Sequence, residues 1–178
     1  MTSDIHRRHD GRTLPRSEVE KRKLEHDAAR LFMRRFEQDT GQPMRHIWHN
    51  EPRKPDTSCF YQGRQLDLEI AHLYASEDEA KWVSGRQEHD PIWWYLQELL
   101  ELSQPQQLKH ALGRLLASKA SKHYDSERVW LVIRNASPAW SREQITQTLH
   151  TLNIDQGEFE QIWLLPDFAG EQPLIQIQ

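Results

Sequence analysis

The fold of this chain is decided by the stretch "KPDTSCFYQGRQLDLEIAHLY", residues 54–74. It contains two segments with the composition and alternation of β-strands, Ser58–Tyr61 and Leu66–Leu73. The tetrapeptide "YQGR" connects them, and its glycine suits a tight turn. The stretch therefore predicts a β-hairpin.

The second strand of this hairpin carries acids on one of its faces. Successive side chains on a strand point to opposite faces, so Asp67 and Glu69 point the same way as Ala71, while the apolar residues between them point into the core. A carboxylate in a strand that enters a core is costly unless something pairs with it. A divalent metal ion would supply that partner, and Asp56, just before the hairpin, adds a third acid.

Before the hairpin, residues 17–39 are predicted to form an amphipathic helix. Ser17 and Glu20 in "SEVE" have the spacing of a capping box, and apolar residues recur at helical spacing as far as Phe36. Glu25 precedes Phe36 by eleven residues, almost a whole number of helical turns, so it lies on the apolar face. Residues 1–16 are polar and aperiodic, which predicts a flexible tail.

The rest of the chain is predicted to alternate between helices and strands. Strands are expected at 44–49, 128–134 and 159–166, and helices at 91–103, 105–123 and 141–152. The helix at 105–123 has a stripe of leucines on one face, at Leu108, Leu112 and Leu115. The same spacing, continued along the helix, leads to Lys119 and Lys122. Both lysines are therefore predicted to lie on the inward face of this helix.

Length and composition suit one compact domain. The chain has 178 residues, of which 37% are hydrophobic, and typical domains have about 100–200 residues. Residues 17–178 are therefore assigned to a single α/β domain. The single cysteine, Cys59, excludes an internal disulfide and fits a reducing compartment. No apolar run approaches the ~20 residues needed to cross a bilayer, and no signal peptide is recognised, so the expected location is the cytoplasm, without a membrane partner.

The charge is distributed unevenly along the chain. Residues 1–54 contain 13 Lys and Arg against 9 Asp and Glu, whereas the remainder contains 10 against 18. Lys and Arg bind nucleic-acid phosphates, so the first third suits DNA, while the acidic remainder needs a metal ion or basic patches to tolerate it. A solvated helix face with a basic tail explains the same distribution.

Other chemistries find little support in the sequence. It contains no phosphate-cradling glycine loop, GxSxG elbow or HExxH helix. His46, His49 and Cys59 are zinc-type ligands, but a structural zinc site needs four ligands and no fourth stands out. On a strand, the two histidines would also face opposite ways.

"KPD", a hairpin through Gly63 and "LDLEIA" together resemble the PD-(D/E)XK nuclease superfamily. The chain resembles in particular the small prokaryotic members in which the lysine position is altered. The resemblance covers Ser17 to about Pro166, in the order helix, three strands, helices, strand, helix, strand. It implies a restriction endonuclease-like fold, which is a mixed central sheet flanked by helices, and metal-dependent hydrolysis of DNA.

The resemblance also implies roles for individual residues. Asp56 and Glu69 would bind Mg²⁺ or Mn²⁺, with the backbone carbonyl of Ile70 as a third ligand, and Glu25 matches the acid on the first helix. The lysine position falls on Ala71, which is a departure from the family pattern. Ala71 can neither activate water nor stabilise charge, so another residue must do so if the protein is an enzyme.

Two substitutes for the missing lysine are open. In the first, Lys119 or Lys122 reaches the site from the later helix. In the second, the motif shifts to Asp67-Leu68-Glu69, so that Asp67 binds metal and Glu69 replaces the lysine. The first is favoured because it also explains two lysines on an inward stripe.

The expected function is therefore that of a Mg²⁺-dependent endonuclease acting on DNA. The alternative is a catalytically inactive nuclease fold that binds nucleic acid or a protein partner. A third hypothesis is a regulatory or assembly protein that forms a homodimer through the apolar helix "IWWYLQELLEL", residues 92–102. Because the resemblance also implies dimers among nucleases, dimerisation alone does not separate these functions.

Overall fold

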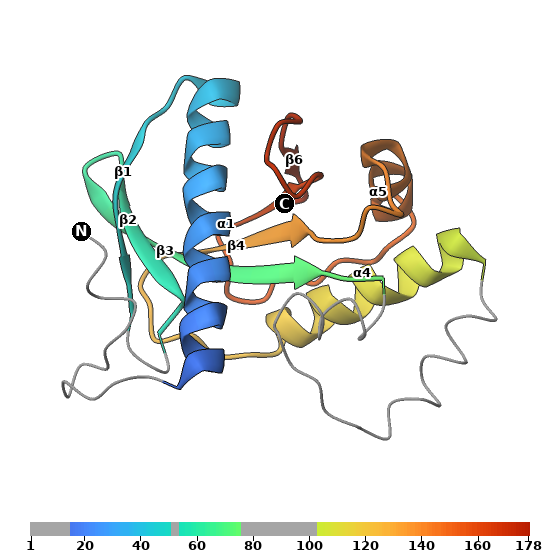
Figure 1. Ribbon diagram of the computed structural model, residues 1–178, viewed down its shortest axis with the longest axis horizontal. Coiled ribbons are helices and arrows are strands. Elements are labelled where there is room, and N and C mark those ends of the chain that lie inside the picture. The colour runs from blue at the N-terminus through green and yellow to red at the C-terminus, as the bar shows by residue number, and fades with distance from the viewer. Residues whose placement is uncertain (1–14, 51–53, 76–102) are drawn as a thin grey trace.

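The computed structural model describes residues 15–50, 54–75 and 103–178, which form an α/β structure (Figure 1). The helices are α1 (Arg16–Thr40), α4 (Gln104–Ala120) and α5 (Arg142–Leu149). The strands are β1 (Met44–His49), β2 (Thr57–Tyr61), β3 (Arg64–Leu73), β4 (Val129–Asn135), β5 (Gln161–Leu165) and β6 (Ile175–Gln176). These strands form one sheet in the order β1-β2-β3-β4-β5-β6. The predicted α/β class with a mixed sheet and flanking helices is confirmed for this part of the chain.

The β2–β3 hairpin forms as the sequence predicts. The two strands are antiparallel, with Tyr61 opposite Arg64 at the closed end. The two turn residues, Gln62 and Gly63, have φ values of 52° and 73°. Two successive positive φ angles are the mark of the type I′ turn, whose twist matches that of the strands, and glycine adopts this conformation without a steric penalty.

The centre of the sheet is parallel, and both of its faces are covered. β3, β4 and β5 run parallel, while β1, β2 and β6 are antiparallel to their neighbours. Along β3, Leu68 belongs to the core under α1 and Leu73 to the core under α4. The sequence predicted one core-facing side with the acids opposite it, but Asp67 and Glu69 are also buried. Central parallel strands are usually covered on both faces, so alternation alone did not reveal the second cover.

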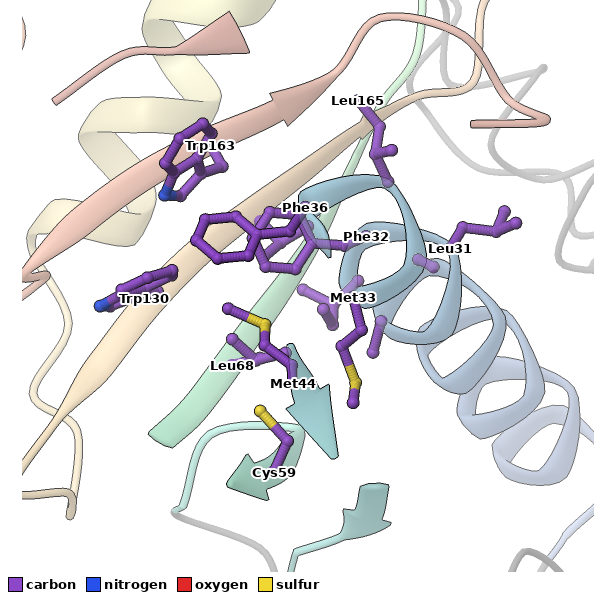
Figure 2. Close-up of a cluster of buried hydrophobic side chains, with 14 of the residues drawn as sticks. Leu31, Phe32, Met33, Phe36, Met44, Cys59, Leu68, Trp130, Trp163 and Leu165 are labelled. Atoms are coloured by element: carbon purple, nitrogen blue, oxygen red, sulfur yellow. The ribbon is translucent and has the colours of Figure 1, made fainter. Parts of the chain in front are cut away.

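The core under α1 contains a cluster of aromatic side chains packed among aliphatic and sulfur-containing ones (Figure 2). Phe36 lies 5.6 Å from Trp130 and 5.3 Å from Trp163, measured between ring centroids. Phe32 and Tyr61 also contact Phe36. Figure 1 shows α1 crossing this face of the sheet. This packing holds α1 over the sheet and thereby sets the position of Glu25.

The core on the opposite face lies under α4 and α5. Leu108, Leu112 and Leu116 of α4 are buried against β4 residues such as Leu131 and Ile133. The predicted leucine stripe is therefore confirmed at its first two positions. It continues at Leu116, because Leu115 is only half-buried.

Several predicted element boundaries are corrected by the structure. α1 begins at Arg16 with Pro15 as its N-cap and no side-chain capping bond, so the capping box predicted at Ser17 is wrong. Glu20 instead forms an ion pair of 2.9 Å with Arg16. The cap predicted at Ser141 is confirmed, since its Oγ accepts a hydrogen bond from the N–H of Gln144 at 3.2 Å.

Two differences concern the C-terminal half. α5 ends at Leu149, so the prediction that it runs to residue 152 is wrong, and β6 was not predicted from the sequence. The apolar helix predicted at 91–103 and most of the predicted N-terminal tail lie outside the described residues. Among the helices that are described, none combines the length and apolar character needed to cross a membrane.

Candidate active site

An ion pair between β3 and α4 forms the centre of the candidate site. Lys119 Nζ lies 2.6 Å from Glu69 Oε1 and 3.5 Å from the carbonyl oxygen of Ile70. Both charged side chains are largely buried, with 18% of Lys119 and 8% of Glu69 exposed. A charge-assisted hydrogen bond of this length is among the stronger polar interactions in proteins. The predicted inward position of Lys119 thus brings an amine onto the acidic face of the hairpin.

Asp56 lies where β2 and β3 separate. β2 begins at Thr57, and Pro55 has no N–H with which to extend the ladder. Asp56 Oδ2 instead accepts a hydrogen bond from the N–H of Ile70 at 2.8 Å. The N–H and C=O of a strand residue point to the same neighbouring strand, so the Ile70 carbonyl also faces this opening. Two carboxylates and one carbonyl are therefore close together.

α1 adds a third acid and a second amine. Glu25 is buried, as its predicted place on the apolar face required. Lys21, one helical turn earlier, has its Nζ 3.5 Å from Glu25 Oε1, and 63% of its side chain is exposed. The Glu25 carboxylate also interacts with the charges of Asp56 and Glu69. The first helix thus contributes to the same group of charges as the hairpin.

Burial and neighbouring negative charge raise the pKa of two carboxylates of this group. Burial, followed by the negative charge of Asp56, raises the pKa of Glu25 to about 8 despite the nearby Lys21 ammonium. Burial, followed by the charge of Glu69, raises the pKa of Asp56 to about 6, although the Ile70 N–H and Lys119 act in the opposite direction. Acids that repel one another in a buried setting are stabilised by a cation. The electrostatics of the group therefore favour binding of a positive ion.

Asp67 is held in a separate hydrogen-bond network. Its Oδ1 accepts from Ser58 Oγ at 2.5 Å and from Gln65 Nε2 at 2.8 Å, and its Oδ2 accepts from Ser126 Oγ at 2.6 Å. Both oxygens of this buried carboxylate are thus satisfied by neutral donors. This arrangement gives Asp67 a structural role and does not favour the shifted motif in which it would bind metal.

Lys122 lies away from the acids. α4 ends at Ala120, and Lys122 follows it with an exposed side chain. The inward stripe therefore stops at Lys119, because the chain leaves the helix before the next turn is complete. Of the residues singled out from the sequence, the structure brings together Glu25, Asp56, Glu69 and Lys119.

Comparison with known proteins gives no family for the chain. No family model, curated protein or solved structure matches it.

The donor atoms of the site suit a small hard cation. Mg²⁺ is usually bound by one or two carboxylates, with water and substrate phosphate completing six ligands. Asp56, Glu69 and the Ile70 carbonyl supply oxygen donors of this kind. Within the described residues, no group of three or more His, Cys, Asp and Glu side chains is placed to hold a metal. With two carboxylates and one carbonyl as protein donors, the remaining positions of a bound Mg²⁺ would be left to water and substrate.

Sequence reasoning missed two residues beside this group. Lys21 could have been found from its spacing of one turn from Glu25. Tyr124 gives no such signal, because it lies in the loop after α4. Its buried hydroxyl donates to the Lys119 carbonyl at 3.3 Å, and burial together with the charge of Glu69 raises its pKa. Tyr124 thereby helps to hold the end of α4 next to Glu69.

Proposed function

We propose that this protein is a metal-dependent phosphodiester hydrolase with a restriction endonuclease-like fold that cleaves DNA. The observation that carries the proposal is the 2.6 Å contact between Lys119 Nζ and Glu69 Oε1, beside the carboxylate of Asp56. Phosphodiester hydrolysis needs oxygen ligands for a metal and positive charge next to the phosphate. The carboxylates of Asp56 and Glu69 and the amine of Lys119 support these two roles.

Each residue of the group has a distinct role in the proposal. Asp56, Glu69 and the Ile70 carbonyl would hold Mg²⁺ or Mn²⁺. When bound, the ion polarises the phosphate and lowers the pKa of a water molecule. Lys119 would donate to a phosphate oxygen, which is the role that Ala71 cannot fill. Glu25, whose pKa is raised to about 8, can accept and release a proton near neutral pH.

Positive charge beside the acids supports a nucleic acid as the substrate. The Lys21 side chain is 63% exposed, and Lys54, two residues before Asp56, is also exposed. Lysine side chains at such positions bind the phosphate backbone without reading its sequence. Phosphates of the bound DNA would therefore be held near the start of α1 and just before β2.

Cleavage of labelled single- and double-stranded DNA tests the proposal. Wild-type protein should cleave in Mg²⁺ or Mn²⁺ and not in a chelator. Glu69→Gln should lower the rate about a hundredfold or more, as expected when transition-state charge stabilisation is lost. Glu127→Gln, which removes an exposed acid, is the matched control and should cleave normally. Equal cleavage by wild type and Glu69→Gln would exclude this site.

A second candidate function is DNA binding without cleavage. It is favoured by Ala71, which is buried on the same face as Glu69, and by the engagement of Lys119 with that acid. Binding that persists in a chelator, together with no cleavage of any DNA tried, would support this function. A turnover that depends on Glu69 would exclude it.

A further inference from the structure

Lys119 contacts two oxygen atoms that the proposed metal ion would need. Its ammonium is 2.6 Å from Glu69 Oε1 and 3.5 Å from the Ile70 carbonyl oxygen. These atoms belong to the same donor set as Asp56, whose carboxylate is anchored on the neighbouring N–H of Ile70. The Lys119 ammonium therefore lies next to the oxygen atoms that would coordinate the metal ion.

An ammonium group and a divalent cation that are bound to the same two oxygen atoms repel each other. A metal such as Mg²⁺ binds a carboxylate oxygen at about 2.0–2.1 Å, which would bring it within a few ångströms of the Lys119 ammonium. Like charges at such a separation in a largely buried site repel strongly. Glu69 Oε1 and the Ile70 carbonyl oxygen can thus either keep their close contact with the Lys119 ammonium or coordinate a metal ion, but not both at once.

The structure allows Lys119 to move without moving its helix. Tyr124 donates to the backbone carbonyl of Lys119, so the end of α4 is held through the main chain. The lysine side chain has four rotatable methylene groups and retains partial exposure to solvent. A swing of the ammonium away from Glu69 therefore needs only rotations about side-chain bonds.

We propose that Lys119 and a divalent cation compete for Glu69 and the Ile70 carbonyl, and that metal binding releases the ammonium to the phosphate of the substrate. This inference rests on the proposed metal site and adds to it a coupling between metal loading and the amine. A lysine that merely held the acids in place for the metal would have the opposite effect on metal affinity.

The affinity of the full chain for Mn²⁺, measured by titration calorimetry, separates these two roles. Lys119→Met should bind Mn²⁺ about tenfold more tightly than wild type, because a repelling charge is removed. Lys122→Met removes an exposed lysine three positions later and should leave the affinity unchanged. An unchanged or weaker affinity in Lys119→Met would overturn the competition.

The result also distinguishes this inference from the proposed function. If wild type binds Mn²⁺ through Glu69 but Lys119→Met does not bind it more tightly, only the competition fails. If neither wild type nor Lys119→Met binds Mn²⁺, the proposed metal site fails and the competition with it.

A measurement on the wild-type protein avoids dependence on the folding of a variant. Brief acetylation followed by mass spectrometry reports how reactive each lysine is. Mg²⁺ should increase the acetylation of Lys119 severalfold, because an amine freed from a carboxylate loses the ion pair that protects it. Lys122 in the same sample should not change. Acetylation of Lys119 that stays constant or falls on addition of Mg²⁺ would contradict the competition.

Discussion

Asp67 and Glu69 share one face of β3 and have different partners. Asp67 accepts hydrogen bonds from hydroxyl and amide groups, including the hydroxyl of Ser126, whereas Glu69 accepts one from the ammonium of Lys119. Alternation along the strand predicts that the two acids point the same way. It does not predict which of them meets an amine, because Ser126 and Lys119 come from a distant part of the chain.

We expect Asp67→Ala to destabilise the protein without affecting metal binding. The variant loses a buried carboxylate that accepts three hydrogen bonds, and its free energy of unfolding should fall by about 2–3 kcal/mol. Its affinity for Mn²⁺ should stay close to that of wild type. Urea denaturation and titration calorimetry measure the two quantities. Loss of Mn²⁺ binding with unchanged stability would instead favour the shifted motif in which Asp67 is the metal ligand.

Glu25 should make the protein less stable as the pH rises. Its pKa is raised from 4.5 to about 8 in the folded chain, so the folded protein keeps a proton that the unfolded chain has lost. Between these two values, the free energy of unfolding therefore decreases with increasing pH, with a slope of at most about 1.4 kcal/mol per pH unit for one group. Urea denaturation between about pH 5 and pH 8, without added metal, measures this slope.

The matched variants for this measurement are Glu25→Gln and Glu127→Gln. Glu25→Gln has no proton to lose, so its stability should decrease less steeply with pH than that of wild type. Glu127→Gln removes an exposed acid and should keep the wild-type slope. Parallel pH profiles for wild type and Glu25→Gln would show that Glu25 does not carry the raised pKa.

α4 is the element that carries the amine to the acids. Its leucine stripe was predictable from helical spacing at Leu108 and Leu112, and so was the inward direction of Lys119. The packing at the end of the helix was not predictable, because it involves a loop 37 residues later, at Gly157. A Cβ atom at Gly157 would lie 2.6 Å from the backbone oxygen of Ala120, the last residue of α4.

We expect Gly157→Ala to disturb the end of α4 and thereby the site. Gly157 has a φ of +56° and no room for a methyl group beside Ala120. Gly41→Ala is the matched control, since Gly41 has a φ of +71° but nothing within 4 Å of the added atom. Gly157→Ala should lose about 1–3 kcal/mol more than Gly41→Ala in urea denaturation. It should also lower the rate of DNA cleavage, whereas equal losses of stability would show that α4 tolerates the added methyl group.

At the scale of the whole molecule, the sheet has two covered faces with a different core on each. The order of helices and strands was largely predictable from periodicity and turn residues. Alternation along β3 alone did not predict that a helix covers its acidic face, because acids that alternate with apolar residues resemble a solvent-exposed face in the sequence. The short strand β6 also gave no sequence signal, since it has two residues and is defined by its pairing with β5.

Phe36 should be a major contributor to the core under α1. Its ring contacts four other aromatic rings, so Phe36→Ala should lower the free energy of unfolding by about 3–5 kcal/mol. Phe60 is 43% exposed on the hairpin, and Phe60→Ala should cost about 1 kcal/mol or less. Thermal or urea denaturation measures both values. Similar losses for the two variants would contradict the assignment of Phe36 to the centre of this core.

The anomalous scattering of Mn²⁺ in crystals of the full chain tests the central claim most directly. The account predicts one strong peak about 2 Å from carboxylate oxygens of Asp56 and Glu69, next to the Ile70 carbonyl, with the Lys119 ammonium moved off Glu69. Crystals of Glu69→Gln should lack this peak. A peak bound by other residues, or none under conditions that support DNA cleavage, would contradict the account.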